Sequence, residues 1–225
     1  MERKTLEKIT EFLLKNANIN KAEFDQKLID TKYQILGIKN QLLENFAKNL
    51  AKNEIDDIFD GDMVYHEQIL IIGYYIAYSK FENSRKIEML KRFLPFIDNW
   101  ATCDCVVTRL KKLESEREFF INLLKNEKPF YKRVGIIWLM RFNLKQNFSD
   151  TLEMFKGVKD DNYYVKMALA WAYAEAFTIN SEFMVDFLLQ IDDKFTRNQT
   201  ISKAKHFSSS ENACVQNAIL SDMQC

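Results

Sequence analysis

The chain of 225 residues is 47% hydrophobic but contains only five Gly and two Pro, too few turn formers for a protein built from many β-hairpins. Its 32 Lys and Arg residues balance 32 Asp and Glu residues, which excludes an overall positive field that would draw the protein to nucleic acid or membranes. A chain of this length can bury one hydrophobic core of ordinary size. We expect a single domain over residues 1–225, and two domains are the alternative.

Apolar residues recur at helical spacing along nearly the whole chain, beginning with Leu6, Ile9 and Leu13. The predicted helices span residues 2–16, 20–33, 39–52, 64–80, 83–93, 101–113, 116–126, 129–144, 149–157, 162–178, 181–190, 195–206 and 210–222. The short gaps between them are typical of antiparallel helices stacked in pairs. We therefore expect an all-α protein.

The first helix is preceded by no apolar segment of signal-peptide length, and the longest apolar run, from Ile69 to Tyr78, is too short to span a bilayer. Four cysteines in a chain of this length do not form the dense framework of a small secreted domain. These features predict a cytoplasmic protein with reduced thiols and no membrane partner.

An internal similarity appears when the sequence is shifted by 33 positions, because YKRVGIIW (Tyr131–Trp138) then falls on YVKMALAW (Tyr164–Trp171). A second shift of the same size reaches Tyr65, at the start of another apolar helix. A period of this length with two helices per unit is typical of α-solenoids with HEAT-like or armadillo-like repeats. We expect such a solenoid with a concave groove, and an irregular helix bundle is the alternative.

The segment DNWATCDC places Trp100 and Asp104 four residues apart, hence on one face of the predicted helix. This pair could belong to the core, to a metal site or to a reaction centre. The sequence lacks a second Cys or His pair at zinc-binding spacing, so we expect no metal site. Cys103 and Cys105 are then expected to be packing residues.

The remaining candidates are aromatic and basic residues, because the sequence contains no nucleophile elbow and no Gly-rich phosphate loop. Trp138 lies in an apolar run and is expected in the core, whereas Trp100 lies beside polar residues and Trp171 is intermediate. Basic residues occur on successive predicted helices, where they are either a solvated face or a ladder that follows a phosphate backbone. These residues are Arg109, Lys111, Lys112, Lys132, Arg133, Lys166, Arg197, Lys203 and Lys205.

Four segments occur in the order DNWATCD, FYKRVGIIWLMRF, DNYYVKMALAWAYAEAF and DKFTRNQTISKAKHF. Together they resemble the AlkD-like DNA alkylation repair glycosylases, which have HEAT-like repeats, and the resemblance covers roughly residues 30–206. It implies a helical groove that holds duplex DNA and hydrolysis of the N-glycosidic bond of cationic N3- or N7-alkylated purines, without a base-flipping pocket.

By this resemblance the functional residues are Trp100, Asp104, Arg133 and Trp171. Asp104 and the two tryptophans are implied to act on the lesion and its sugar, and Arg133 is implied to bind a phosphate. The basic ladder adds Lys132, Lys166 and Lys203 as expected DNA contacts.

A cationic purine leaves as a neutral base, so the reaction needs a carboxylate to stabilise the sugar rather than an acid or a cofactor. The resemblance implies duplex DNA with alkylated bases as the partner, and we expect no cofactor, no obligate protein partner, and a monomer. The chain departs from catalytic relatives at two positions, where Ala101 replaces an acid and Ala174 replaces an arginine. A non-catalytic module that binds branched or distorted DNA is the alternative function, and a protein-interaction scaffold is a third.

Overall fold

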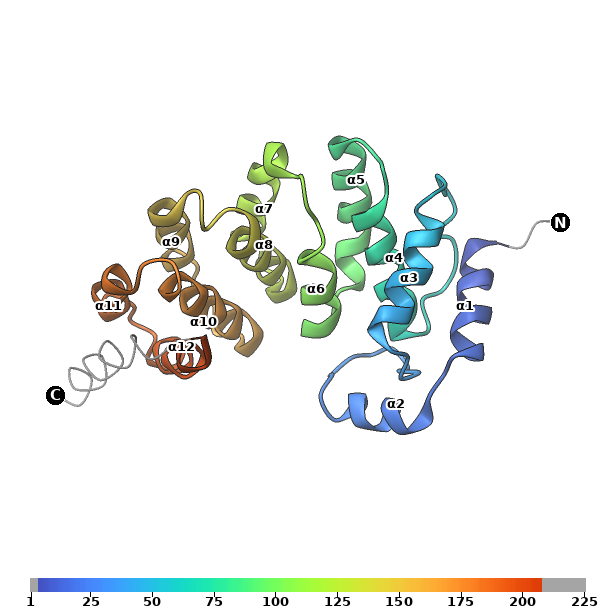
Figure 1. Ribbon diagram of the computed structural model, residues 1–225, viewed down its shortest axis with the longest axis horizontal. Helices are drawn as coiled ribbons and strands as arrows, with labels where there is room; N and C mark the ends of the chain where they lie inside the picture. The colour runs from blue at the N-terminus through green and yellow to red at the C-terminus, as the bar shows by residue number, and fades with distance from the viewer. Residues whose placement is uncertain (1–3, 208–225) are drawn as a thin grey trace. The chain divides into compact units, whose positions relative to one another are not determined.

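The computed structural model describes residues 4–207, with side chains described through Ala204. Over this range the chain forms α-helices and two short 3-10 helices and contains no β-strand, which confirms the all-α prediction (Figure 1). The chain divides into two compact units, one ending at Glu116 and the other beginning at Arg117. The predicted helix 210–222 lies outside the described residues.

The first unit is organised around one central helix. Its helices are α1 (Thr5–Lys15), α2 (Ile19–Gln26), α3 (Asn40–Leu50), α4 (His66–Tyr78), α5 (Asn83–Phe93) and α6 (Trp100–Val107), with the 3-10 turns η1 (Leu94–Phe96) and η2 (Glu114–Glu116). Helix α4 is buried from His66 through Ala77, because α1, α3, α5 and α6 all pack against it. A helix that is apolar on every side has to be surrounded in this way.

Close contact between α4 and α6 depends on Gly73. A Cβ atom at this position would lie 2.3 Å from a methyl carbon of Val106 on α6 and 2.8 Å from the Phe93 ring on α5. The missing side chain therefore lets three helices meet at one point. This contact fixes where α6 lies, and α6 carries Trp100 and Asp104.

The predicted helix 101–113 is too long, because α6 ends at Val107. The Thr108 hydroxyl bonds to the carbonyl oxygen of Asp104 at 2.7 Å, and Lys112 adopts a left-handed backbone with φ 61° that a helix cannot continue through. Leu110 and Leu113 are nevertheless buried, so an irregular segment reproduces the apolar spacing of a helix. Arg109, Lys111 and Lys112 consequently lie after α6 rather than on it.

The predicted helix 20–33 also ends early, at Gln26. The chain beyond it runs toward α6, and Gln34 then forms a parallel bridge with Tyr65, in which the Gln34 amide donates to the Val64 carbonyl oxygen at 3.0 Å. Contacts with other parts of the unit have replaced the local helical hydrogen bonds here. The N-terminal half of this prediction is confirmed, and the C-terminal half is wrong.

The second unit stacks helices in two rows. Its helices are α7 (Arg117–Leu123), α8 (Pro129–Phe142), α9 (Phe148–Lys156), α10 (Tyr163–Phe177), α11 (Ser181–Leu189) and α12 (Lys194–Phe207). Helices α8, α10 and α12 pack one against the next, while α7 packs on α8, α9 on α8 and α10, and α11 on α10 (Figure 1). This stacked arrangement is that of an α-solenoid, and the similarity at a shift of 33 residues relates the neighbouring helices α8 and α10.

Alanines on α10 explain how two helices can flank it closely. Ala168, Ala170, Ala172, Ala174 and Ala176 are all buried. Small side chains on several faces of a helix allow neighbours to approach from different directions. Within residues 4–207 no helix is both long enough and apolar enough to cross a membrane.

Candidate functional site

The N-terminus of α6 is built by a polar cap. The Asn99 side-chain oxygen accepts the Thr102 amide at 2.9 Å, while the Asn99 amide nitrogen donates to the Thr102 hydroxyl at 3.1 Å. This cap begins the helix at Trp100. Because Thr102 and Cys103 form the buried side of α6, Trp100 and Asp104 share the opposite side, as the spacing of the sequence predicts.

The indole of Trp100 is held in place although it is 37% exposed. Its Nε1–H donates to the carbonyl oxygen of Leu28 at 3.1 Å. The adjacent Asp98 carboxylate accepts the Thr31 hydroxyl at 2.9 Å and the Lys32 amide at 3.0 Å. The segment after α2 is therefore bonded to the start of α6 and orients an aromatic face toward solvent.

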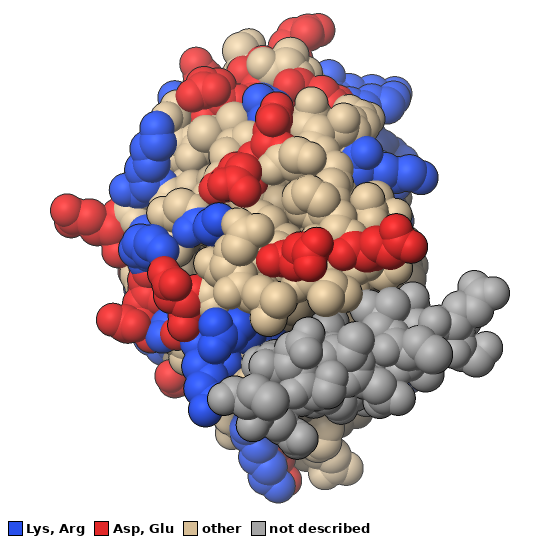
Figure 2. Space-filling view, turned by 90° about the vertical axis from the view of Figure 1, so that its left-hand side faces the viewer, with Lys and Arg blue, Asp and Glu red and all other residues tan. Residues whose placement is uncertain are grey.

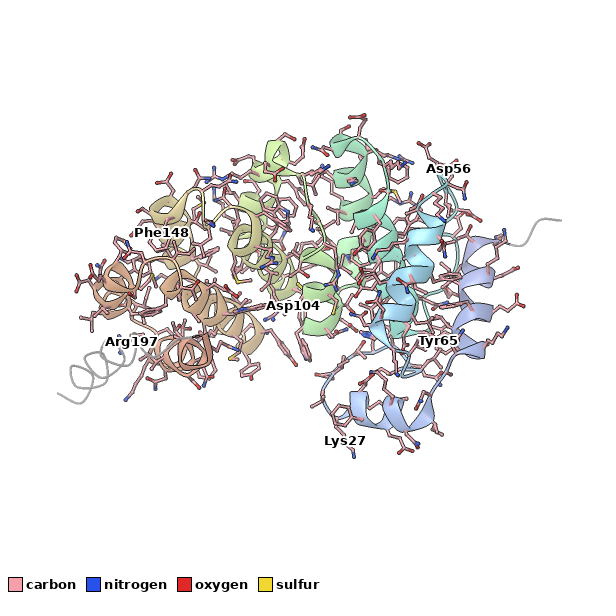
Figure 3. All side chains as sticks on the ribbon, viewed as in Figure 1. Lys27, Asp56, Tyr65, Asp104, Phe148 and Arg197 are labelled. Atoms are coloured by element: carbon pink, nitrogen blue, oxygen red, sulfur yellow. The ribbon has the colours of Figure 1, made fainter. Side chains whose placement is uncertain are left out.

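Asp104 lies one turn after Trp100 and is half-buried (Figure 3). Next to it, burial raises the pKa of the Cys105 thiol, and the negative charge of Asp104 raises it further. Cys103 is fully buried, which confirms its prediction as a packing residue, and the thiol of Cys105 is neutral at pH 7.

A polar network lies between α3, α4 and the segment after α6. The Tyr74 hydroxyl donates to the Asn40 side-chain oxygen at 2.6 Å, and the guanidinium of Arg109 lies 5.4 Å from the centre of the Tyr74 ring. Arg109 also donates to Glu44 at 3.2 Å. Burial raises the pKa of Glu44, but hydrogen bonds from Lys48 and Tyr78 and the charge of Arg109 outweigh this effect and lower the pKa to about 2.

This network changes the interpretation of Arg109, which the sequence places in a ladder of cations. Its charge is paired with Glu44 inside the first unit. The sequence gives no signal for this pair, since Glu44 and Arg109 are 65 positions apart. The network reaches α6 through Asn40, whose side-chain nitrogen lies 3.6 Å from the sulfur of Cys105.

Arg133 and Lys132 are both on α8, and both side chains bond to other residues of the second unit. Arg133 is buried, and its Nη1 donates to the carbonyl oxygen of Tyr164 on α10 at 2.6 Å. The ammonium group of Lys132 lies 2.7 Å from a carboxylate oxygen of Asp160. Burial raises the pKa of Asp160, but the hydrogen bond from Lys132 outweighs it and keeps the pKa below its usual range.

Lys166 repeats the arrangement of Lys132 one helix further along. Its ammonium group lies 3.0 Å from carboxylate oxygens of Asp161 and Asp193, and these hydrogen bonds raise its pKa. Asp193 also accepts the backbone amide of Thr196 at 2.7 Å at the start of α12. Lys203 is half-buried on α12.

The three tryptophans differ as the sequence predicts. Trp138 is buried, with its ring 4.0 Å from that of Phe120 in a stacked arrangement, which confirms it as a core residue. Trp171 is half-buried, and its Nε1–H donates to Glu175 at 3.1 Å on the same helix. Ala101 and Ala174, the two departures from the family pattern, are buried. A charged side chain at either position would need different packing around it.

An exposed aromatic cluster of the second unit was not predicted. The Tyr163 ring is 56% exposed and lies 5.9 Å from Phe195, while Phe130 lies 5.3 Å from Tyr164. Phe130, Tyr163 and Phe195 occur at the starts of α8, α10 and α12, at intervals close to the repeat length. An aromatic residue at each helix start is the sequence signal that could have identified this cluster.

Trp100 and Asp104 therefore lie together in the first unit, whereas Lys132, Arg133, Lys166, Trp171 and Lys203 lie in the second. On the face drawn in Figure 2, basic and acidic side chains are interspersed, which agrees with the formal charge of zero. Among the described residues no three His, Cys, Asp or Glu side chains are grouped to hold a metal ion. What the α6 pair offers chemically is a carboxyl group on the same side of the helix as a partly exposed indole, and both kinds of group can stabilise a cation.

Two comparisons with known proteins bear on the identity of the chain. A family model described as DNA alkylation repair enzyme matches residues 9–207, which is most of the chain. A search of curated proteins found no significant match.

Proposed function

Because the chain belongs to the DNA alkylation repair enzyme family, we propose that it is a DNA glycosylase that releases cationic N3- and N7-alkylated purines from duplex DNA. The observation that carries this proposal is the pair on α6, where the Trp100 indole is held by Leu28 one turn before Asp104. A carboxylate and a fixed aromatic face suit a reaction that develops positive charge.

Hydrolysis of this glycosidic bond does not require the protein to protonate the leaving base. An alkylated purine carries a positive charge, so when the bond from C1′ to nitrogen breaks, the electron pair goes to the base and the base leaves neutral. The sugar becomes oxocarbenium-like, water adds to C1′, and a proton of that water is released to solvent or to Asp104. Asp104 stabilises the charge at the sugar, which is the electrostatic role that usually contributes most to catalysis.

The tryptophans would contact the cationic lesion and its sugar. A cation over an indole face gains about 0.5–2 kcal/mol, depending on how far it is removed from water. Trp100 is exposed and Trp171 is half-buried, so both present part of a ring at the surface of their units. We propose that Trp100 provides the aromatic surface for the lesion and Trp171 the aromatic surface for its sugar.

The proposed DNA contacts come from the second unit. Lys132 and Lys166 are paired with aspartates, so a phosphate that binds either of them has to compete with a carboxylate. Arg133 bonds to a backbone carbonyl group, and this bond fixes the direction of its guanidinium group. Lys203 is the fourth proposed contact. No cofactor is needed, and a cytoplasmic monomer acting on duplex DNA is part of the same proposal.

A non-catalytic module for branched or distorted DNA is the second candidate. The ion pairs of Lys132 and Lys166 and the buried Ala174 favour it, because they reduce the positive charge available to a duplex.

The decisive experiment measures release of 7-methylguanine from a methylated duplex in the presence of EDTA, together with binding to the same duplex. We expect release above the spontaneous rate. Asp104→Asn should lower the rate by about 10²- to 10³-fold while binding is retained or becomes tighter, since a charge that repels phosphates is lost. Asp186→Asn, a change of an exposed acid on α11, is the matched control and should leave the rate unchanged.

The outcomes separate the candidates. Binding without release in the unchanged protein supports the non-catalytic module, and equal release by Asp104→Asn removes Asp104 from the mechanism. A duplex with a neutral lesion such as hypoxanthine should not be processed, because its base needs protonation to leave. Failure to bind DNA in a salt-sensitive manner would leave the scaffold as the remaining candidate.

A further inference from the structure

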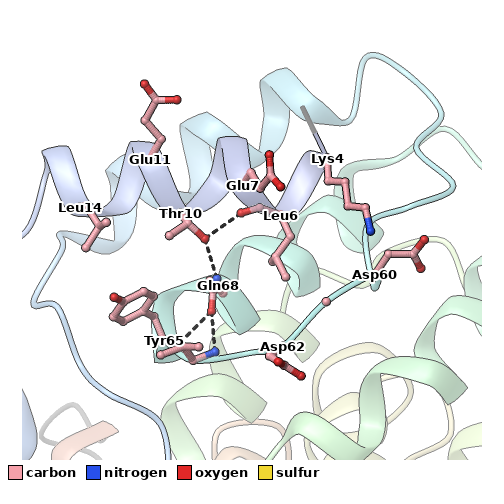
Figure 4. Close-up of a pocket in the computed structure, with 12 residues that line it drawn as sticks. Lys4, Leu6, Glu7, Thr10, Glu11, Leu14, Asp60, Asp62, Tyr65 and Gln68 are labelled. Carbon is pink, nitrogen blue, oxygen red and sulfur yellow. Dashed lines mark hydrogen bonds between the residues drawn. The ribbon is translucent and has the colours of Figure 1, made fainter. Parts of the chain in front are cut away.

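The first unit has a groove that the proposed reaction does not use. It lies between α1 and the loop of residues 60–65 and has a volume of about 730 Å³ (Figure 4). This volume is within the range of about 300–1,000 Å³ that is typical of binding sites. None of the site residues named above lines it.

The groove has an apolar floor that is partly open to water. Leu6 is buried beneath it, while Leu14 on α1 and Val64 in the loop line it and are 55% and 48% exposed. The Tyr65 side chain completes the floor (Figure 4). Single exposed apolar residues are common, but several that converge in one depression form a surface suited to an apolar partner.

The wall of the groove is held rigidly. The Gln68 side-chain oxygen accepts the backbone amides of Val64 and Tyr65, each at 2.8 Å, and its nitrogen donates to the Thr10 hydroxyl on α1 at 2.9 Å (Figure 4). Gly61, with φ 132°, lets the loop approach α1, since a Cβ atom there would lie 2.8 Å from Leu6. A groove fixed in this way loses little entropy when it binds.

The rim carries an excess of negative charge. Four acids line the groove against a single basic residue, Lys4. The acids are Glu7 and Glu11 on α1 and Asp60 and Asp62 in the loop. All four are exposed, so they can meet an incoming cation without loss of a core contact. A negative rim repels DNA phosphates and attracts Lys or Arg.

The position of the groove allows its use during DNA binding. Within the first unit α1 and α6 lie on opposite sides of α4 (Figure 1), and α1 and α6 each pack against α4. A ligand in the groove therefore does not cover Trp100 or Asp104. Two ligands of opposite charge could occupy this unit together.

We propose that the groove docks a short basic amphipathic segment of a partner protein, with apolar anchors on Leu14 and Val64 and Lys or Arg side chains beside the acidic rim. Charge complementarity selects this occupant over nucleic acid, and the apolar floor selects it over a polar basic tail. The C-terminal sequence of the chain, FSSSENACVQNAILSDMQC, contains no Lys or Arg and does not match this requirement.

The test uses the full-length protein and a fluorescent amidated peptide of leucine and lysine with helical amphipathic spacing, followed by fluorescence anisotropy. Two matched peptides, one with serine for leucine and one with glutamate for lysine, keep the length and change one property each. We expect saturable binding of the leucine–lysine peptide and at least about tenfold weaker binding of both others.

Protein variants locate the binding. Leu14→Ser removes an exposed anchor, and the double change of Glu7→Gln with Asp62→Asn removes rim charge; each should weaken binding by about tenfold. The matched controls are Leu189→Ser for the apolar change and Glu118→Gln with Glu127→Gln for the charges, all at exposed positions outside the groove. Circular dichroism melting verifies that every variant is folded.

Several results would overturn the proposal. They are the absence of peptide binding, equal binding of the serine–lysine peptide, and equal weakening by the control variants. Sedimentation of the protein alone could also overturn the proposal. If the protein is a dimer and Leu14→Ser makes it a monomer, the groove binds a second copy of the chain instead. Release of alkylated bases is measured separately, so failure of the docking proposal and failure of the proposed enzyme activity are distinguishable.

Discussion

Asp98 is the residue through which the fold orients Trp100, and its replacement gives a quantitative prediction. The carboxylate accepts the Thr31 hydroxyl at 2.9 Å, the Lys32 amide at 3.0 Å and the Asn99 side-chain amide at 2.8 Å. At a net value of about 0.5–1.5 kcal/mol for each bond, Asp98→Ala should lower the free energy of unfolding by about 2–3 kcal/mol. Asp98→Asn keeps one acceptor oxygen and should cost about 1–2 kcal/mol.

Asp98→Ala should also lower the activity of the protein that remains folded. Without Asp98, the segment that carries Leu28 is released, and the Trp100 indole loses the acceptor of its Nε1–H. If Trp100 contacts the lesion, misplacement of its ring should lower the rate of base release by about 10- to 100-fold at temperatures where the variant is fully folded. Hydrogen exchange read by mass spectrometry should rise in residues 27–33 and remain unchanged around α10.

A double-mutant cycle tests the reasoning itself. Thr31→Val removes the donor and Asp98→Ala the acceptor of one hydrogen bond, so their combined cost in urea unfolding should be about 1 kcal/mol less than the sum of the single costs. Additive costs, or unchanged exchange in residues 27–33, would show that Asp98 does not hold this segment and would refute its role in positioning Trp100.

Three further predictions concern the first unit. Burial lowers the pKa of His66 from its usual 6.5, so below pH 6.5 the unfolded chain takes up a proton that the folded chain does not. The free energy of unfolding, measured in urea, should therefore fall by up to about 1.4 kcal/mol for each pH unit below 6.5. It should fall less steeply in His66→Gln. Glu67→Ala should cost about 3–5 kcal/mol in the same assay, because its buried carboxylate accepts the amides of residues 36–38, whereas Glu67→Gln should cost less. Gly73→Ala should cost about 1–3 kcal/mol by forcing Val106 away, and an unchanged melting temperature would contradict the close contact of α4 and α6.

Most of the fold could be predicted because helical periodicity is local. The helices that run from α3 to α5 and from α8 to α11 begin and end within about three residues of their predicted bounds, since apolar spacing and polar caps determine them. One clear error, in residues 27–33, lies where contacts with distant residues replace helical bonds, and the other lies in the segment after α6. Leu110 and Leu113 imitate the spacing of a helix in a segment that Lys112 interrupts, and no local pattern could have revealed this.

The candidate site was predictable in part for the same reason. A spacing of four residues places Trp100 and Asp104 on one side of α6 whatever surrounds the helix. The sequence could not show that Glu44 neutralises Arg109 or that Asp160 neutralises Lys132, because these partners meet only in the folded chain. A ladder of basic residues is therefore a weaker prediction than a pair fixed by helical geometry.

The ion pairs of the second unit have a consequence for how a repair protein treats undamaged DNA. Lys132 pairs with Asp160 just before α10, and Lys166 pairs with Asp193 just before α12. If these lysines contact DNA as proposed, each aspartate competes with a phosphate oxygen for the same ammonium group. Undamaged DNA would then gain little binding free energy from the two lysines, which favours its rapid dissociation.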